Sequence, residues 1–119
     1  MKRSLTKSER LKKRSEIETV FSSGARVSCS GAKLFWVENG LSYNRIACTV
    51  VRRYGNAVER NRAKRFIREV FRNEKHCLKG GHDLVVLMYP GDYDFWKRKE
   101  QFEDLCAKAG LFFDTVENR

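Results

Sequence analysis

The chain has 119 residues, of which 41% are hydrophobic, and its single proline and eight glycines leave no linker or low-complexity segment. This composition excludes a disordered chain and predicts one domain over residues 1–119. No apolar run reaches the roughly 20 residues of a membrane span, and the N-terminus lacks the apolar core of a signal peptide. We therefore expect a cytoplasmic protein with no membrane partner.

Two basic segments carry the entire charge excess. The formal net charge is +10 at pH 7. Residues 1–14 have seven Lys and Arg against one Glu, and residues 52–72 have eight against two acidic residues, so each segment has a net charge of +6. Charge of one sign that is concentrated in this way is typical of nucleic-acid-binding proteins.

The N-terminal residues 1–14 are predicted to form a basic arm, in which Leu5 and Leu11 are candidate anchors. Ser15 and Glu18 have the S-x-x-E spacing of a capping box, which predicts a helix that begins at Ser15. Gly24 is a suitable end for this helix. Because the helix is short, tertiary packing must hold it.

Strand patterns follow the first helix. Leu34 and Trp36 are expected on one face of the sheet, with Phe35 and Val37 on the other. The last of the three strands is apolar on both faces, which indicates a central position in the sheet. The three predicted strands are residues 25–29, 33–38 and 45–53.

The second half of the chain alternates helix, strand and helix. A helix is predicted over 56–74 with its first residue as the N-cap, and a buried strand over 82–89. Asp92 or Asp94 caps a last helix, which Gly110 ends. The order α-β-β-β-α-β-α predicts an α+β protein, a two-layer α/β sandwich whose helices lie on a central four-stranded sheet.

The helix over 56–74 has an unusual distribution of charge. At about 100° per residue its apolar side chains fall on one side, as a core-facing helix requires. Between Arg60 and Arg72 only Glu69 offsets six basic residues, so the ion pairs of an ordinary solvated helix are largely missing. We interpret the helix as a surface for a polyanion. Its apolar stripe comprises Ala63, Phe66, Ile67, Val70 and Phe71, with Arg60 and Lys64 on one shoulder and Arg62 on the other.

Two features together favour RNA as this polyanion. Arg52 and Arg53 lead through a tight turn into the basic helix, and arginine forks bind phosphate oxygens two at a time. Phe21 and Phe35 could stack on unpaired bases if the first helix leaves a groove along the sheet. Packing of both rings in the core is the alternative.

The sequence predicts no catalytic residue and no metal site. The two histidines have no triad spacing around them. Asp92 and Asp94 could bind a metal ion, but two carboxylates beside a helix start are more often caps. Two alternatives to an RNA-binding subunit stay open: a structural RNA-binding protein of the ribosomal type, and a metal-dependent nuclease that uses the two aspartates.

The run GNAVERNRAKRFIREVFR, from residue 55 to 72, resembles the signature of the bacterial ribonuclease P protein subunit. The core of that signature is Arg60-Asn61-Arg62 followed by Lys64-Arg65, and VVRRY precedes the run. The segment RLKKRSEIETVFSSG, from 10 to 24, is similar to the other recurrent segment of the family.

This resemblance implies a fold and a function. The fold would be a small, ribosomal-protein-like α/β sandwich in which the helix after Asn56 joins two parallel strands by a left-handed crossover. The protein would bind the catalytic RNA of ribonuclease P, and the two together would remove the 5′ leader from precursor tRNA. Mg²⁺ held by the RNA would supply the chemistry, while the protein would bind no cofactor and no small-molecule substrate.

By position, the resemblance assigns two groups of residues. One group faces the catalytic RNA, and the other lines a cleft between the first helix and the sheet that takes the single-stranded leader. Ile17 stands where the family is commonly aromatic, and Val51 stands where it usually has a small hydroxyl residue. The catalytic-RNA group is Arg52, Arg53, Asn56, Arg60, Asn61, Arg62, Lys64, Arg65 and Arg68. The leader group is Ile17, Phe21 and Phe35.

Overall fold

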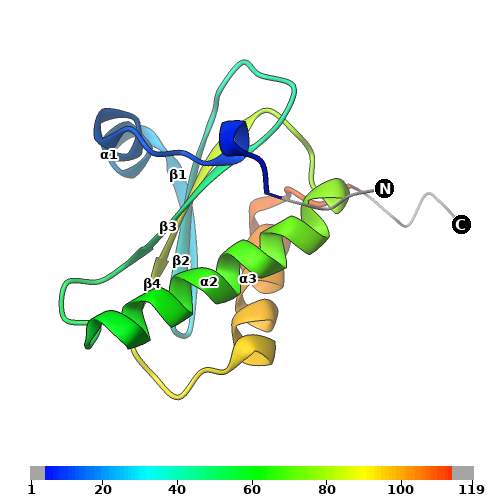
Figure 1. The fold of residues 1–119 in the computed structure, drawn as a ribbon. Helices are drawn as coiled ribbons and strands as arrows, with labels where there is room; N and C mark the ends of the chain where they lie inside the picture. Colours follow the sequence, from blue (N-terminus) through cyan, green and yellow to red (C-terminus); the bar gives the residue numbers. More distant parts are fainter. Residues whose placement is uncertain (1–4, 114–119) are drawn as a thin grey trace, which may run out of the picture.

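Four strands form the sheet at the centre of the fold (Figure 1). They are β1 (Ala25–Cys29), β2 (Ala32–Glu38), β3 (Arg45–Val50) and β4 (His82–Met88). Their order across the sheet is β1-β2-β4-β3, with β2 antiparallel to both of its neighbours and β3 parallel to β4. The computed structural model describes residues 5–113, so residues 1–4 of the predicted arm lie outside the description.

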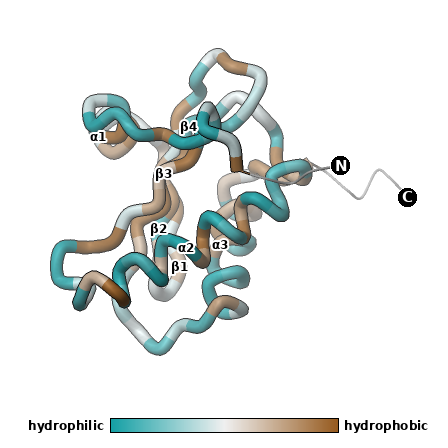
Figure 2. The backbone as a smooth tube through the Cα atoms, in the orientation of Figure 1, coloured by the Kyte–Doolittle hydropathy of each residue, from teal (hydrophilic) through white to brown (hydrophobic). Residues whose placement is uncertain are grey.

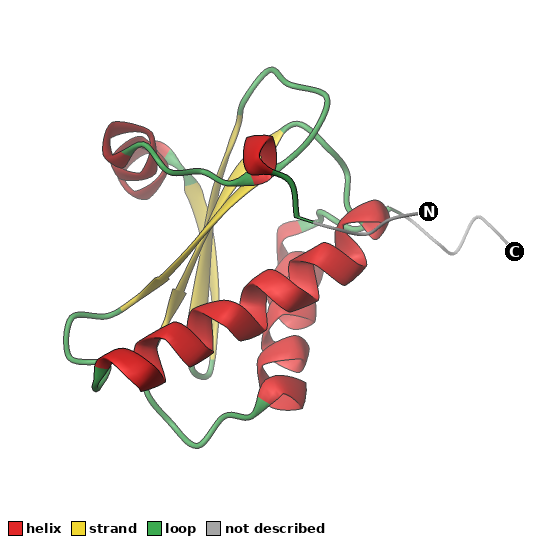
Figure 3. Cartoon of the chain, in the orientation of Figure 1, coloured by secondary structure: helices red, strands yellow, loops and turns green. Residues whose placement is uncertain are grey.

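Helices lie on both faces of this sheet (Figure 3). They are α1 (Arg14–Ser23), α2 (Ala57–Glu74) and α3 (Phe95–Ala109), with the short 3-10 turns η1 (Lys7–Glu9) and η2 (Lys75–Cys77). The predicted α+β protein with a four-stranded sheet and three helices is confirmed. α2 and α3 form the expected layer on one face, and α1 covers part of the other face. No helix within residues 5–113 is long and apolar enough to cross a membrane.

Alternating side chains divide the interior into two cores. Leu34 of β2 lies in the larger core with Ile67 of α2 and Phe102 of α3. Phe35 lies in the smaller core with Val20 of α1. This is the division that the alternation in β2 predicted. Figure 2 shows the related pattern along α2, where hydrophobic and hydrophilic residues alternate because only one side of the helix meets the sheet.

The predicted central position of the third strand was wrong, because β3 is an edge strand. Its outer edge is covered by the N-terminal segment. Arg10 forms a parallel bridge with Ile46, and the N–H of Leu11 donates to the carbonyl of Ile46 at 2.9 Å. Leu11 is only 4% exposed, so residues 5–13 pack against the sheet as part of the domain. β3 is apolar on both faces because Ile46 and Cys48 pack in the larger core and Ala47 packs with Leu11 in the smaller one.

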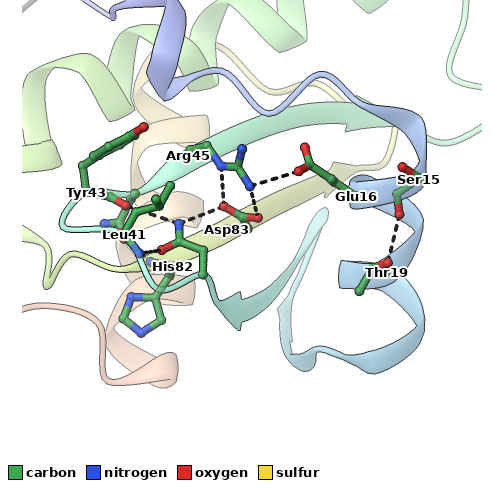
Figure 4. A network of polar contacts seen from close by, with 10 residues as sticks. Ser15, Glu16, Thr19, Leu41, Tyr43, Arg45, His82 and Asp83 are labelled. Atoms are coloured by element: carbon green, nitrogen blue, oxygen red, sulfur yellow. Dashed lines mark hydrogen bonds and ion pairs between the residues drawn. The ribbon is translucent and has the colours of Figure 1, made fainter.

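The predicted start of the first helix was also wrong. α1 begins at Arg14, Lys13 takes the N-cap position, and no side chain caps this end. Ser15 lies inside the helix, where its carbonyl accepts a hydrogen bond from Thr19 Oγ1 at 2.9 Å (Figure 4). The anchored segment before α1 sets where the helix begins, and this tertiary constraint overrides the local capping signal. The predicted end at Gly24 is confirmed.

A polar cluster fixes α1 to the sheet (Figure 4). Arg45 of β3 binds Asp83 of β4 through two hydrogen bonds, with Nε–Oδ1 and Nη2–Oδ2 distances of 2.8 and 2.7 Å. Glu16 of α1 reaches the same guanidinium at 3.5 Å, and Asn39 donates to Asp83 Oδ1 at 2.9 Å. These charges raise the pKa of Arg45 above its ordinary value, with the hydrogen bond to Asp83 as the largest cause. The cluster therefore sets the position of α1 on the sheet.

The contact between α2 and α3 contains a pair of carboxyl groups. Burial raises the pKa of Glu74 from 4.5 to about 7, and a hydrogen bond with Glu103 adds to this shift. Lys99 lies 3.3 Å from Glu74 and 2.7 Å from Glu103, and it opposes the shift only in part. The pKa of Glu103 is lowered, first because Glu74 donates a hydrogen bond to it. The buried thiol of Cys106 faces the same two carboxyl groups. Glu74 thus retains a proton near neutral pH.

This proton predicts a pH dependence of stability. The pKa of Glu74 is higher in the folded chain than in the unfolded chain. The contribution of Glu74 to the free energy of unfolding is therefore complete below about pH 4.5 and is lost as the pH rises through about 7. The pKa of Glu103 is lowered in the folded chain, so its contribution to stability is lost as the pH falls. Glu74→Gln keeps a hydrogen-bond donor that never ionises. We expect its melting temperature, relative to wild type, to increase between pH 5 and pH 8.

Thermal unfolding of both proteins at pH 5, 6, 7 and 8 measures this difference. Glu100→Gln is the control, because Glu100 is exposed and pairs only with Lys97 at 3.6 Å. A difference between Glu74→Gln and wild type that stays constant over this range would contradict the shared proton.

Candidate RNA interface

The turn between β3 and α2 carries two of the predicted RNA-binding residues, Arg52 and Arg53, and both are exposed. The N–H of Tyr54 donates to the carbonyl of Val51 at 3.1 Å and closes the turn. Arg60, one turn into α2, donates from Nη1 to the carbonyls of Arg52 at 3.1 Å and Val51 at 3.4 Å. Arg60 therefore fixes the conformation of the turn as well as adding charge beside it.

The start of α2 is fixed by a capping box. Asn56 Oδ1 accepts from the N–H of Glu59 at 2.9 Å, and Glu59 Oε1 accepts from the N–H of Asn56 at 3.2 Å. The predicted N-cap is confirmed. Gly55 has φ +143°, and a Cβ atom there would lie 2.2 Å from Glu59 Oε1. Asn56 was also predicted to contact RNA, but its side-chain oxygen is already engaged in the cap.

A buried arginine from α3 holds this turn from inside the protein. Arg98 is 0% exposed and donates to the Tyr54 hydroxyl at 2.6 Å and to the carbonyl of Tyr89 at 2.9 Å. It also donates to the carbonyl of Gly31 at 3.1 Å and to Gln101 Oε1 at 2.8 Å. All four of these acceptors are neutral. Arg98 was not predicted from the sequence. The available signal was a charged residue that interrupts the apolar stripe of the last helix between Phe95 and Phe102.

The basic side chains of α2 follow the predicted periodicity in part, since Arg68 was expected opposite the apolar stripe but is partly buried beside β3. Asn61, Arg62 and Arg65 are exposed, while Arg60, Lys64 and Arg68 are partly buried. Many other cations have acidic partners: Arg72 pairs with Glu69, for example, and Lys108 with Asp104. Within residues 5–113, seven predicted RNA-binding cations form no ion pair with a carboxylate. They are Arg52, Arg53, Arg60, Arg62, Lys64, Arg65 and Arg68.

The two basic segments of the sequence meet at the edge of β3. Arg10 and Lys12 of the N-terminal segment line a pocket of about 180 Å³ together with Arg68 of α2. Burial raises the pKa of Cys48 in β3 to about 12, and the nearby charges of Arg68, Lys64 and Arg10 oppose this shift. The fold therefore joins residues far apart in the sequence into one cationic surface.

The predicted leader cleft lies on the opposite face of the sheet from α2 and α3. Ile17 and Phe21 of α1 are partly buried there and contact the smaller core. Phe35 is only 7% exposed. The rings of Phe21 and Phe35 pack edge to face, with 4.8 Å between their centroids. Phe35 has no open ring face for a base, so its prediction as a direct stacking residue is corrected. Phe35 instead packs against the buried side of Phe21.

Further residues on this sheet face were missed by the sequence analysis. Lys33 of β2 lies opposite Leu87 of β4, and Leu87 is opposite Thr49 of β3. All three are partly buried, and the Lys33 ammonium lies 5.7 Å from the centroid of the Tyr89 ring. Period-two alternation from Phe35 and Val85 could have placed these residues on the same face. The result is an apolar floor with a cation beside it.

Asp94, one of the two candidate metal ligands, accepts a hydrogen bond at Oδ1 from the N–H of Lys97 at 2.9 Å and caps α3. Among residues 5–113, no three His, Cys, Asp or Glu side chains come together as a metal-binding group.

The fold and this surface define a basic α+β protein that presents unpaired cations and a partly open sheet face to a nucleic acid.

The sequence model of the family described as Ribonuclease P matches residues 5–110. The ribonuclease P protein component of Thermotoga petrophila is 33% identical over 114 residues, which cover 91% of this chain and 97% of that protein. That of Petrotoga mobilis is 41% identical over 81 residues, covering 68% and 69%. The chain therefore belongs to the ribonuclease P protein family, and the ribosomal-type alternative is not favoured.

Solved structures agree with this assignment. The RNase P protein of Staphylococcus aureus has a TM-score of 0.82 and 25% identity, and the match covers 90% of this chain and 100% of that chain. The RNase P protein of Thermotoga maritima has a TM-score of 0.74 and 30% identity, with coverage of 81% and 93%.

The contact between Tyr54 and Arg98 gives a prediction about stability. Tyr54→Phe removes only the hydroxyl, which leaves a buried guanidinium short of one acceptor. We expect the free energy of unfolding to fall by about 1.5–3 kcal/mol, the usual contribution of a hydrogen bond to a charged group. Urea denaturation measures the loss.

Tyr93→Phe is the matched control for this variant. It retains the ring that lies 4.5 Å from the Arg98 guanidinium, so its stability should stay near that of wild type. Equal effects of the two variants would show that the Tyr54 hydroxyl has no special part in holding the turn.

Proposed function

We propose that this chain binds the catalytic RNA of ribonuclease P and the 5′ leader of precursor tRNA, and thereby assists removal of the leader. One observation carries the proposal: seven cations on α2 and the preceding turn have no carboxylate partner within the described residues, although ion pairs are common elsewhere in the protein. Phosphates of an RNA would neutralise such an array.

The catalytic RNA is proposed to lie along α2. Arg62 and Arg65 are exposed and can direct their guanidinium groups to phosphate oxygens. Arg52 and Arg53 extend this surface from the turn, which Arg60 and Arg98 hold in place. Arg10 and Lys12 continue it beyond Arg68 along the edge of β3. Packing fixes the cations before RNA binds, so less conformational entropy is lost on binding.

The leader is proposed to lie on the opposite face of the sheet, beside α1. Phe21 offers a partly exposed ring that Phe35 holds from below, and Ile17 adds apolar surface rather than a second ring. Lys33 can pair with a phosphate of the same strand. Stacking on one ring with a nearby cation suits single-stranded RNA of any sequence.

The chemistry is proposed to take place in the RNA subunit. The residues that the structure describes bring together no metal-binding group of acidic, His or Cys side chains, and Asp94 serves as a helix cap. We assign the Mg²⁺ of the reaction to the RNA-containing enzyme, as membership of the family implies. The bacterial relatives support the cytoplasm as the proposed compartment.

A reconstitution assay tests this function. Labelled precursor tRNA is incubated at low Mg²⁺ with the protein, with the Thermotoga maritima ribonuclease P RNA, or with both. The Thermotoga maritima protein, which is 32% identical to this chain, is the positive control. We expect cleavage only with both components. Cleavage by the protein alone would indicate a nuclease, and failure to stimulate while the positive control succeeds would indicate another RNA-binding role.

Replacing one unpaired cation should weaken RNA binding in a salt-dependent manner. Arg65→Ala removes a proposed phosphate contact, so the slope of log affinity against log salt concentration should become shallower by about 0.7–0.9. Filter binding of the catalytic RNA at several salt concentrations measures the slope.

Lys108→Ala removes the same charge from α3, where Lys108 pairs with Asp104 at 3.1 Å. This control should leave the slope unchanged. If both variants change the slope equally, overall charge governs binding and the α2 array has no special role.

The leader site gives a separate prediction. Phe21→Leu keeps an apolar side chain over Phe35 but removes the aromatic ring. Affinity for precursor tRNA should fall within the roughly 1–3 kcal/mol of one stacked base. Affinity for leaderless tRNA should not change. Binding of both substrates to the reconstituted enzyme measures the difference, and an equal loss for both would rule out a leader contact at Phe21.

A further inference from the structure

A row of aromatic rings leads from α2 onto the first turn of α3. The Arg62 guanidinium lies 5.1 Å from the centroid of the Phe66 ring. Phe66 meets Phe95 edge to face with a centroid distance of 5.8 Å, and Phe95 meets Trp96 in the same way at 5.2 Å. The row thus connects a cation of the proposed RNA interface to a side chain on another helix.

Trp96, at the end of this row, is 68% exposed. Phe66 and Phe95 are partly buried, so they anchor the row, while Trp96 remains open to solvent. An indole has a large apolar surface and is the ring that binds cations and stacks most strongly. The contact with Phe95 restricts its orientation, which lowers the entropy cost of placing another ring on it.

The cation that contacts this row comes from α2. Lys97 pairs with Glu100 at 3.6 Å, and Asp94 caps α3 while it keeps its negative charge. Arg62, at the start of the row, lines a pocket with Glu59, Asp92 and Asp94 but forms no ion pair with a carboxylate among the described residues. The buried core of a protein–protein interface is enriched in apolar and aromatic side chains. The other exposed large apolar side chains are instead spread over several elements: Leu41, Tyr43, Val58 and Phe113.

We propose that Trp96 is a stacking platform for an unpaired base of the catalytic RNA, and that the backbone of the same RNA segment passes over Arg62 and Arg65. The proposal rests on the proposed function. It extends the RNA interface from α2 to α3, onto a residue outside the run from 55 to 72. Stacking on Trp96 adds affinity without adding a phosphate contact.

Affinity and salt dependence together test this platform. Trp96→Ala should bind the Thermotoga maritima ribonuclease P RNA about 5- to 140-fold more weakly, the equivalent of one lost base stack. Its log–log salt slope should equal that of wild type, because no phosphate contact is lost. Trp96→Phe should recover most of the affinity. Tyr43→Ala, at an exposed aromatic residue in the loop between β2 and β3, should bind like wild type.

Fluorescence supplies a direct readout of stacking. The chain has two tryptophans, and Trp36 is partly buried against the larger core. RNA should quench the emission of wild type, and this quenching should largely disappear in Trp96→Phe, where only Trp36 remains.

The outcomes separate this proposal from the proposed function. If wild type fails to bind RNA, the proposed function fails. If wild type binds and Trp96→Ala binds equally well without loss of quenching, the platform is wrong. If Trp96→Ala instead abolishes self-association in sedimentation while RNA affinity is unchanged, Trp96 belongs to an interface between two copies of the chain, which also overturns the proposal.

Discussion

Repulsion between closely spaced positive charges is the constraint on which the rest of the structure depends. Seven cations with no acidic partner among the described residues lie on α2 and the turn before it, and packing and hydrogen bonds hold these elements together. The apolar side of α2 is buried on the sheet through Ala63, Ile67, Val70 and Phe71. Hydrophobic burial of these side chains thus opposes the charge repulsion and keeps the cations in a fixed arrangement.

Several polar groups of the interface serve the fold as well as binding. Arg60 fixes the carbonyls of the turn that carries Arg52 and Arg53, and Arg98 holds the same turn through Tyr54. Asn56 caps α2. A basic residue of the signature can therefore act by positioning its neighbours in the folded chain. The exposed Arg62 and Arg65 are the more direct candidates for contact.

The sheet has two surfaces that meet at the edge of β3, where Ile17 lines the same pocket as Arg68. Residues that alternate along β2 and β4 face α2 and α3 on one side and α1 on the other. The cluster of Arg45, Asp83 and Glu16 holds α1 on its side of the sheet (Figure 4). Phe21 is thereby kept over Phe35 at one end of a face that continues to Leu87. One sheet thus carries a cationic helix on one face and an apolar floor on the other.

The sequence by itself determined the element order, the division of β2 between two faces, the cap at Asn56 and the apolar side of α2. Each of these depends on local periodicity or on side chains a few residues apart. Only the tertiary structure decided that β3 is an edge strand covered by Leu11, that α1 begins at Arg14 and that Phe35 is buried. It alone revealed Arg98 beneath the turn and the meeting of Arg10 with Arg68. These features depend on contacts between residues far apart in the chain, which no local pattern specifies.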